Sequence, residues 1–379
     1  MMRATEYLEH LRITFPELIE QVQIIKHCYD QKLYHQLTSQ LEDFVLLPQV
    51  AQKNELVNLY EHFIKEFESK LKPLSLVLIC ITIASHLENN ESARKFLEQI
   101  SEKVKKDKSG YILSLAFIAS KHLDAKQLPE AKQILETAKD ELKGVTGLEQ
   151  TVYASFYQVN ADYHKIMDQQ SEFYQSALLY LSYSKEIPLP QQQTLALDLC
   201  IAALVSDNVY SFGDLIVNPV LKSLEGTPFA WLIQLLKVYN VGNIHQYQQL
   251  IAKNQDALTK IPKLNNNKDQ LAQKISILSL IDLAFRTPSD KRLISFATIA
   301  QTTELQLGEI EFLLMKALSL KLIRGLIDQI DQTIMITWVT PRILDINQIA
   351  TMKSKILDWT DKTQQSLRIL ETETVDLVV

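Results

Sequence analysis

The chain has 379 residues, of which 46% are hydrophobic and 22% are charged, a composition typical of a folded protein rather than a disordered one. Only 8 residues are glycine, well below the usual share of roughly 7%, which argues against a fold rich in tight β-turns or glycine-rich ligand loops. The net charge of −6 excludes a general attraction to nucleic acid or anionic membranes. A mostly helical protein is the simplest expectation.

Three sequence features bear on the compartment of the protein. Cys28, Cys80 and Cys200 are far apart and form no CxxC, which favours buried thiols in a reducing compartment. The first residues, MMRATEYLEHLR, carry charges where a signal peptide needs an apolar core, so we expect no secretion. The longest apolar run, residues 74–84, is about half the length of a membrane span and predicts a buried helix.

The first part of the chain contains related segments. HLENNESARKFLEQI from His86 resembles HLDAKQLPEAKQILETA from His122, and a looser copy begins at Ala161. Each copy predicts the end of one helix, a short polar turn and a second helix, with Ala93 and Ala131 where two helices cross closely. Repeated helix pairs of this length indicate an α-solenoid of the tetratricopeptide type. Further pairs are predicted at residues 5–28 with 33–46, 191–207 with 212–224, and 229–239 with 245–254.

The solenoid is predicted to cover residues 1–265, because Pro262 and three asparagines interrupt the helical pattern there. A second domain, residues 268–345, follows. It shows a helix, a short extended piece at 293–296, a short helix and a longer helix that Gly325 is expected to end. Strands at 326–330 and 333–339, joined by a turn at 331–332, complete the order of a winged helix. The hairpin should pair with the short strand, since two strands alone are marginal.

The last segment, residues 346–379, is predicted to form a helix and a tail. Apolar residues recur there at spacings of three and four: Ile346, Ile349, Met352, Ile356 and Trp359. The helix could fold back on its own winged helix, or it could pack with helices of partner subunits. The second interpretation is favoured, because the apolar stripe exceeds six turns and little chain follows to cover it.

Motifs for catalysis or cofactor binding are missing from the sequence. There is no GxxxxGK[ST], no GxGxxG after a strand, no HExxH and no GxSxG. His27 and Cys28 are neighbours, and adjacent residues point about 100° apart on a helix. We therefore expect a protein that is not an enzyme, with no catalytic residue, no metal ligand and no cofactor.

The winged helix raises the question of DNA binding. Residues 286–345 carry seven basic and seven acidic residues, and Glu309 and Glu311 begin the helix that would enter a major groove. Phosphates would repel these carboxylates, so nucleic-acid binding is disfavoured. The alternative is a protein partner that extends an exposed edge of the wing sheet. The predicted interface residues on the wing are Ile334, Ile336 and Trp338.

Helical repeats that run directly into a winged helix resemble the PCI domains of the proteasome lid, the COP9 signalosome and a eukaryotic translation initiation factor. Residues 173–181, 212–250 and 294–345 carry a closer resemblance, above all MKALSLKLIRGLIDQIDQTIMITWVTPRIL. They resemble the PCI-containing non-ATPase regulatory subunits of the 26S proteasome lid, and among these the subunit-thirteen family.

This resemblance implies a non-catalytic scaffold in the cytoplasm and nucleus that supports lid assembly and ubiquitin-dependent protein degradation. Its wing sheet would associate with other PCI subunits, and its C-terminal helix would join a bundle of partner helices. The lid deubiquitinase dimer and the ubiquitin-receptor subunit are further expected partners, whereas nucleic acid and membranes are not. Two alternatives stay open: a PCI scaffold of a sister complex (COP9 signalosome or translation initiation factor), and a winged-helix nucleic-acid binder.

Overall fold

The computed structural model describes residues 4–47, 50, 55–87, 89–184, 187–287, 292–341 and 346–373. The chain folds into two compact units, Met1–Pro188 and Leu189–Val379. The sequence analysis assigned residues 189–265 to the solenoid. In the structure these residues belong to the same compact unit as the winged helix.

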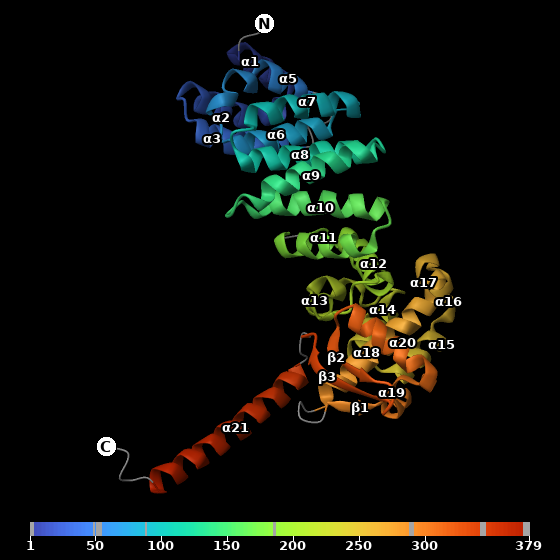
Figure 1. Ribbon diagram of the computed structural model, residues 1–379. Coiled ribbons are helices and arrows are strands. Elements are labelled where there is room, and N and C mark those ends of the chain that lie inside the picture. The colour runs from blue at the N-terminus through green and yellow to red at the C-terminus, as the bar shows by residue number, and fades with distance from the viewer. Residues whose placement is uncertain are drawn as a thin grey trace. The chain divides into compact units, whose positions relative to one another are not determined.

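The first unit consists of antiparallel helices in successive layers (Figure 1). Its helices are α1 (Ala4–Thr14), α2 (Ile19–Asp30), α3 (Tyr34–Val45), α5 (Glu55–His62), α6 (Pro73–Ser85), α7 (Asn90–Val104), α8 (Lys108–Asp124), α9 (Leu128–Lys143), α10 (Gln150–Ile166) and α11 (Gln170–Tyr183), with 3₁₀ turns η1 (Pro16–Leu18), η2 (Ile64–Glu66) and η3 (Glu68–Lys70). The predicted repeat is confirmed: Ala93 and Ala131 are fully buried, and Leu97 and Leu135 lie one turn further on. A small side chain there lets neighbouring helices approach closely.

The turns between paired helices share one geometry. In the α8–α9 turn, Lys126 has a φ of 58°, and the Gln127 N–H donates to the His122 carbonyl oxygen at 2.9 Å. The Gln127 Oε1 lies 2.9 Å from His122 Nδ1, so the two side chains that border the turn are in hydrogen-bond contact. The α10–α11 turn repeats these interactions with His164, Asp168 and Gln169. This equivalence confirms the looser third copy of the repeat.

The N-terminal helices differ from the prediction. Residues 5–28 form not one helix but α1 and α2, separated by η1. Pro16 explains the break: it has no N–H to donate, and its ring would clash with the preceding turn. It stands instead in the first turn of η1, where a missing N–H costs nothing.

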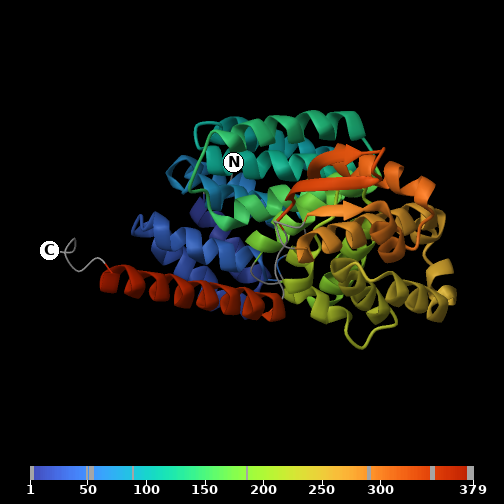
Figure 2. The same ribbon diagram turned by 60° about the horizontal axis from the view of Figure 1, so that its bottom comes forward.

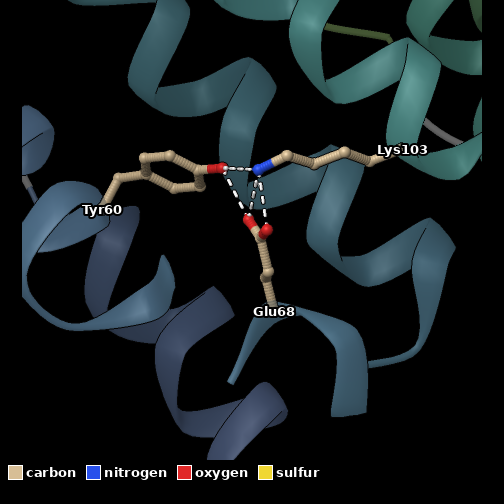
Figure 3. A network of polar contacts seen from close by, with 3 residues as sticks. All are labelled: Tyr60, Glu68 and Lys103. Carbon is tan, nitrogen blue, oxygen red and sulfur yellow. Dashed lines mark hydrogen bonds and ion pairs between the residues drawn. The ribbon is translucent and has the colours of Figure 1, made fainter. Parts of the chain in front are cut away.

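A polar network fixes the irregular segment after α5 (Figure 3). The Tyr60 hydroxyl donates to Glu68 at 2.8 Å, and the Lys103 ammonium reaches both Glu68 oxygens at 2.7 and 2.8 Å. Burial and the bond to Glu68 raise the pKa of Tyr60 far above its usual value, so its hydroxyl remains a donor. The network ties α5, η3 and α7 together.

The second unit begins with helices, which are followed by a small sheet and then by the long helix α21 (Figure 2). Its helices are α12 (Leu189–Val205), α13 (Gly213–Val217), α14 (Ala230–Val241), α15 (Ile244–Lys253), α16 (Gln255–Thr259), α17 (Pro262–Asn266), α18 (Lys268–Arg286), α19 (Phe296–Thr303), α20 (Leu307–Ser319) and α21 (Ile346–Glu373), with η4 (Pro219–Leu224) and strands β1 (Leu293–Ser295), β2 (Ile323–Asp328) and β3 (Thr333–Val339).

Prolines interrupt the helices of this unit at two places, and one of them divides a predicted helix. Residues 212–224 form α13 and the 3₁₀ turn η4, because Pro219 starts a new turn that the Asn218 side chain caps. Near Pro262 the helical pattern is interrupted, as the sequence predicted, because Ile261 is extended with a φ of −108° and a ψ of 94°. Pro262 then begins the short helix α17, and α18 starts after the non-helical Asn267.

The predicted winged helix is confirmed. The order α18, β1, α19, α20, β2, β3 is observed, and the strands form an antiparallel sheet in the order β1-β3-β2. Its core joins α18, α19 and α20 to the inner face of the sheet; examples are Ile281, Ile299, Leu314 and Ile334. Three strands and a packed face give this hairpin the stability that two strands lack.

The end of α20 was predicted too late. The helix stops at Ser319 rather than Gly325, because Lys321 takes a φ of 58° and the Leu322 N–H donates to the Ala317 carbonyl oxygen at 3.1 Å. A lysine in a position that favours glycine carries no sequence signal. Strand β2 therefore begins at Ile323, three residues before the predicted start.

Candidate protein-interaction surfaces

The wing sheet places two of the predicted interface residues in its interior. Strand β3 lies between β1 and β2, and Ile334 and Ile336 on it are buried in the winged-helix core. Ile334 is paired with both β1 and β2, and Ile336 is paired with β2 while its N–H donates to the Arg292 carbonyl oxygen, so neither residue lies at a free edge. The prediction that these residues mark an exposed edge is therefore wrong. Alternation along one strand reveals its faces, but not which strand is in the middle.

Trp338, near the end of β3, is partly exposed to solvent. Its side chain is 37% exposed, and the Arg324 guanidinium lies 4.8 Å from the centre of its ring. This cation–π contact joins β2 to β3, since Arg324 and Trp338 are paired in the sheet. Trp338 thus remains accessible beside the core that contains Ile336.

The open edges belong to β1 and β2. Strand β1 has 3 residues and β2 has 6, so β2 offers the longer edge to a partner strand. Its register shifts between Arg324 and Gly325, where a Cβ on Gly325 would lie 2.3 Å from the Met335 carbonyl oxygen. Only glycine permits this approach. The regular part of the edge runs from Gly325 to Asp328.

The outer face of the same sheet carries an apolar row that the sequence analysis did not single out. Leu293, Met335 and Leu326 are direct cross-strand neighbours on the three strands. Their side chains are 66%, 54% and 74% exposed. Contiguous apolar side chains in water favour coverage by a partner. The alternation of Met335 with its buried neighbours was the available signal.

Helix α21 presents the predicted apolar stripe to solvent. Ile349, Met352, Ile356 and Trp359 are all exposed. The backbone of Ile346 starts the helix, but its side chain lies outside the described residues. All described side chains from Ile349 to Thr372 are exposed, so the closed interpretation, in which α21 covers its own winged helix, is not the observed arrangement.

Two threonines interrupt the apolar stripe of α21 between Trp359 and Leu367. The Thr360 hydroxyl donates to the Ile356 carbonyl oxygen at 2.9 Å, and the Thr363 hydroxyl donates to that of Trp359 at 2.8 Å. Their hydroxyls are thus satisfied within the helix, and their methyl groups extend the stripe. A partner could bury this stretch without leaving a polar group unpaired.

The exposed side chains of α20 differ from those of a helix that binds in a DNA groove. Phe312 and Met315 are exposed on it, and Glu311 accepts from the Gln329 side chain at 3.1 Å. A phosphate backbone requires cations at such positions. Apolar and acidic side chains suit a protein partner better than a nucleic acid.

Signs of catalytic chemistry are weak in the described part of the chain. It contains no group of three or more histidine, cysteine or acidic side chains arranged to hold a metal ion. Burial raises the pKa of Cys200 to about 12 and that of Cys80 further, so both thiols stay protonated and are poor nucleophiles. None of the described helices combines the length and apolarity that a membrane span requires.

Comparison with known proteins decides the family. Residues 21–236 match the family described as PSD13 N-terminal repeats, and residues 251–338 match the PCI domain. A Dictyostelium discoideum protein named 26S proteasome non-ATPase regulatory subunit 13 is 56% identical over 378 residues, covering 98% of each chain. The chain belongs to the family of proteasome non-ATPase regulatory subunit 13.

Other members of the subunit-13 family support this assignment. Homolog A of subunit 13 from Arabidopsis thaliana is 38% identical and covers the full length of both chains. The regulatory subunit RPN9 of the Saccharomyces cerevisiae 26S proteasome is 31% identical over 89% of this chain and 88% of its own. The residues of this chain that match the PCI domain end at 338, so they include the wing sheet except Val339 and exclude α21.

Proposed function

We propose that this protein is a non-catalytic structural subunit of the 26S proteasome regulatory-particle lid, where it supports assembly and ubiquitin-dependent protein degradation. The observation that carries the proposal is the full-length similarity to proteins named as regulatory subunit 13 of this complex. A structural subunit of such a hetero-oligomer needs surfaces that bind other subunits rather than a catalytic site.

The exposed stripe of α21 and the margin of the wing sheet supply such surfaces. Ile349, Met352, Ile356 and Trp359 form an apolar side that other helices would bury, and Ile346 begins it. On the wing, the interface is assigned to the β2 edge, the outer-face row of Leu293, Met335 and Leu326, and Trp338. The expected partners are other PCI subunits of the lid, the lid deubiquitinase dimer and the ubiquitin-receptor subunit, in the cytoplasm and nucleus.

Affinity purification tests this function directly. A tagged full-length chain should co-purify with lid subunits identified by mass spectrometry, whereas a chain lacking residues 346–379 should stay folded and fail to join them. Recovery of a sister complex with the full-length chain would overturn the assignment. Unchanged lid recovery with the shortened chain would overturn the role of α21.

The absence of catalysis has its own test. The purified chain should leave ubiquitin chains uncleaved in the absence of other subunits. Cleavage by the isolated chain would contradict a purely structural role.

A further inference from the structure

A groove of about 620 Å³ lies between α18 and α20, and its described lining residues include none from the wing sheet or from α21. Ala272, Leu305 and Leu313 line its apolar part, and Phe312 stands at its margin. Its volume is within the range of roughly 300–1,000 Å³ typical of binding sites. The groove goes beyond the surfaces assigned to lid assembly.

The side of α20 that borders this groove carries two exposed apolar side chains. Phe312, which lines the groove, is 70% exposed, and Met315, one turn later and outside the lining, is 45% exposed, whereas Leu313 and Leu314 between them are buried. An aromatic ring and a flexible thioether beside an open groove are characteristic of sites that take up the apolar side of another chain. Neither side chain supports the core of the winged helix.

The walls of the groove determine the conformation of what can enter. Both walls are α-helices, whose backbone N–H and C=O groups are engaged within the helix. An extended peptide would find no backbone partners there and would lose its hydrogen bonds to water. A helix satisfies its own backbone and needs only side-chain contacts.

The charges beside the groove determine which helix fits. Asp269 and Glu309 line it, and Lys316 is its one lining cation. The Lys316 ammonium donates to the Gln273 side chain across the groove. Glu309 also accepts from the Gln306 N–H at the start of α20, and the lining as a whole carries two carboxylates and one ammonium. This net negative charge favours a cationic partner.

We propose that the α18–α20 groove binds an amphipathic helix of another protein whose apolar side is flanked by lysine or arginine. Its large apolar side chain packs against Phe312, and its basic side chains lie near Asp269 and Glu309. From Leu307 to Lys316 the wall measures about 14 Å, which matches two to three helical turns. The anchors of the partner are therefore spaced i, i+3 or i+4, and i+7.

The test uses the full-length protein and labelled synthetic peptides of 18 residues. One peptide carries leucine at helical spacing with flanking lysines, a second replaces the lysines by glutamates, and a third is a scrambled version of the first. Fluorescence anisotropy should detect binding of the lysine peptide, and Phe312→Gln should weaken it at least tenfold. Met315→Gln should weaken it to a smaller extent, and the other two peptides should bind at least tenfold more weakly.

Two control variants separate this site from the other exposed apolar surfaces. Leu326→Gln alters the outer sheet face and Ile356→Gln alters α21, and both should bind the lysine peptide as the parent protein does. Unchanged binding by Phe312→Gln overturns the proposal, as does loss of binding in Ile356→Gln alone. Equal affinity for the glutamate peptide also overturns it, because the charge argument then fails.

A cross-link in the assembled complex identifies the occupant. A photoreactive phenylalanine analogue in place of Phe312 should join to a lysine- or arginine-flanked helix of another chain, identified by mass spectrometry. A cross-link to α21 of the same chain, or to a segment that is not helical, would overturn the proposal.

Discussion

The Lys274 ammonium nitrogen lies 2.7 Å from the carbonyl oxygen of Ser206, just beyond the end of α12. The same ammonium donates to the carbonyl oxygens of Ala203 at 2.7 Å and Leu204 at 3.1 Å. A helix C-terminus carries partial negative charge and unsatisfied carbonyl groups, and here a side chain from α18 satisfies three of them. Lys274 thus ties the helical repeat region to the first helix of the winged helix.

Replacement of Lys274 by methionine should destabilise the protein. Methionine keeps most of the apolar stem but leaves buried carbonyl oxygens without donors, at a cost of about 1–3 kcal/mol. Chemical denaturation measures this loss, and hydrogen exchange should accelerate around residues 206–210. Lys268→Met changes an exposed lysine on the same helix and should leave both measurements unchanged. Equal stability of the two variants would contradict a capping role for Lys274.

The stability of the protein should rise with pH above neutrality because of Lys274. Burial lowers its pKa to about 7 from an ordinary value of 10.5, although Asp207 acts in the opposite direction. Between these two values the unfolded chain binds more protons than the folded one, so the free energy of unfolding increases as pH rises. Denaturation from pH 6.5 to 9.5 should reveal this slope in the parent protein. Lys274→Met should show a smaller slope; identical slopes would contradict the assignment.

Two adjacent residues on β3 should differ in how much stability the protein loses when each is replaced by alanine. Ile336 is buried, so Ile336→Ala should lower the free energy of unfolding by about 2–5 kcal/mol. Met335 faces solvent, so Met335→Ala should change it by no more than about 0.5 kcal/mol. Urea denaturation measures both variants. A mild effect of Ile336→Ala would return that residue to the list of candidate interface positions.

Replacement of glycine by alanine should destabilise the protein at the sheet bulge and stabilise it at the start of α20. Gly325→Ala places a Cβ against the Met335 carbonyl oxygen and should cost on the order of 1–3 kcal/mol. Gly308→Ala meets no atom within 4 Å in α20 and should stabilise the protein by about 0.5–1 kcal/mol. Thermal unfolding followed by circular dichroism compares the two. Stabilisation by Gly325→Ala would mean that the bulge does not restrict this position.

Charges on the apolar stripe of α21 should disrupt assembly without unfolding the subunit. The double variant Ile349→Asp with Ile356→Asp should lose co-purification with lid subunits, since buried unpaired carboxylates oppose helix packing. Its free energy of unfolding should change by no more than about 0.5 kcal/mol, because both side chains are exposed.

The control for α21 places the same charges on its opposite side. Ser354→Asp with Gln365→Asp should leave co-purification intact. A sharp fall in thermal stability of the isoleucine variant would instead indicate that the stripe belongs to the core of the protein.

Local patterns in the sequence were sufficient for the helix pairs, the order of the winged helix and the stripe of α21. Ala93 and Ala131 recur with their helices, and Met352 to Trp359 repeat the spacing of one helical face, so period and composition carry this information. The three-stranded sheet followed from the same reasoning, because the hairpin needed a third strand.

Tertiary contacts decided what local patterns leave open. The middle position of β3 buried Ile334 and Ile336, since strand order depends on pairing between distant segments. Lys274 became a helix cap because the end of α12 lies against α18, and Lys321 ended α20 in a conformation that favours glycine. The sequence by itself determined the type and order of most helices and strands, although not all of their ends. Only long-range packing decided which of their sides face solvent, because burial depends on neighbours that are distant along the chain.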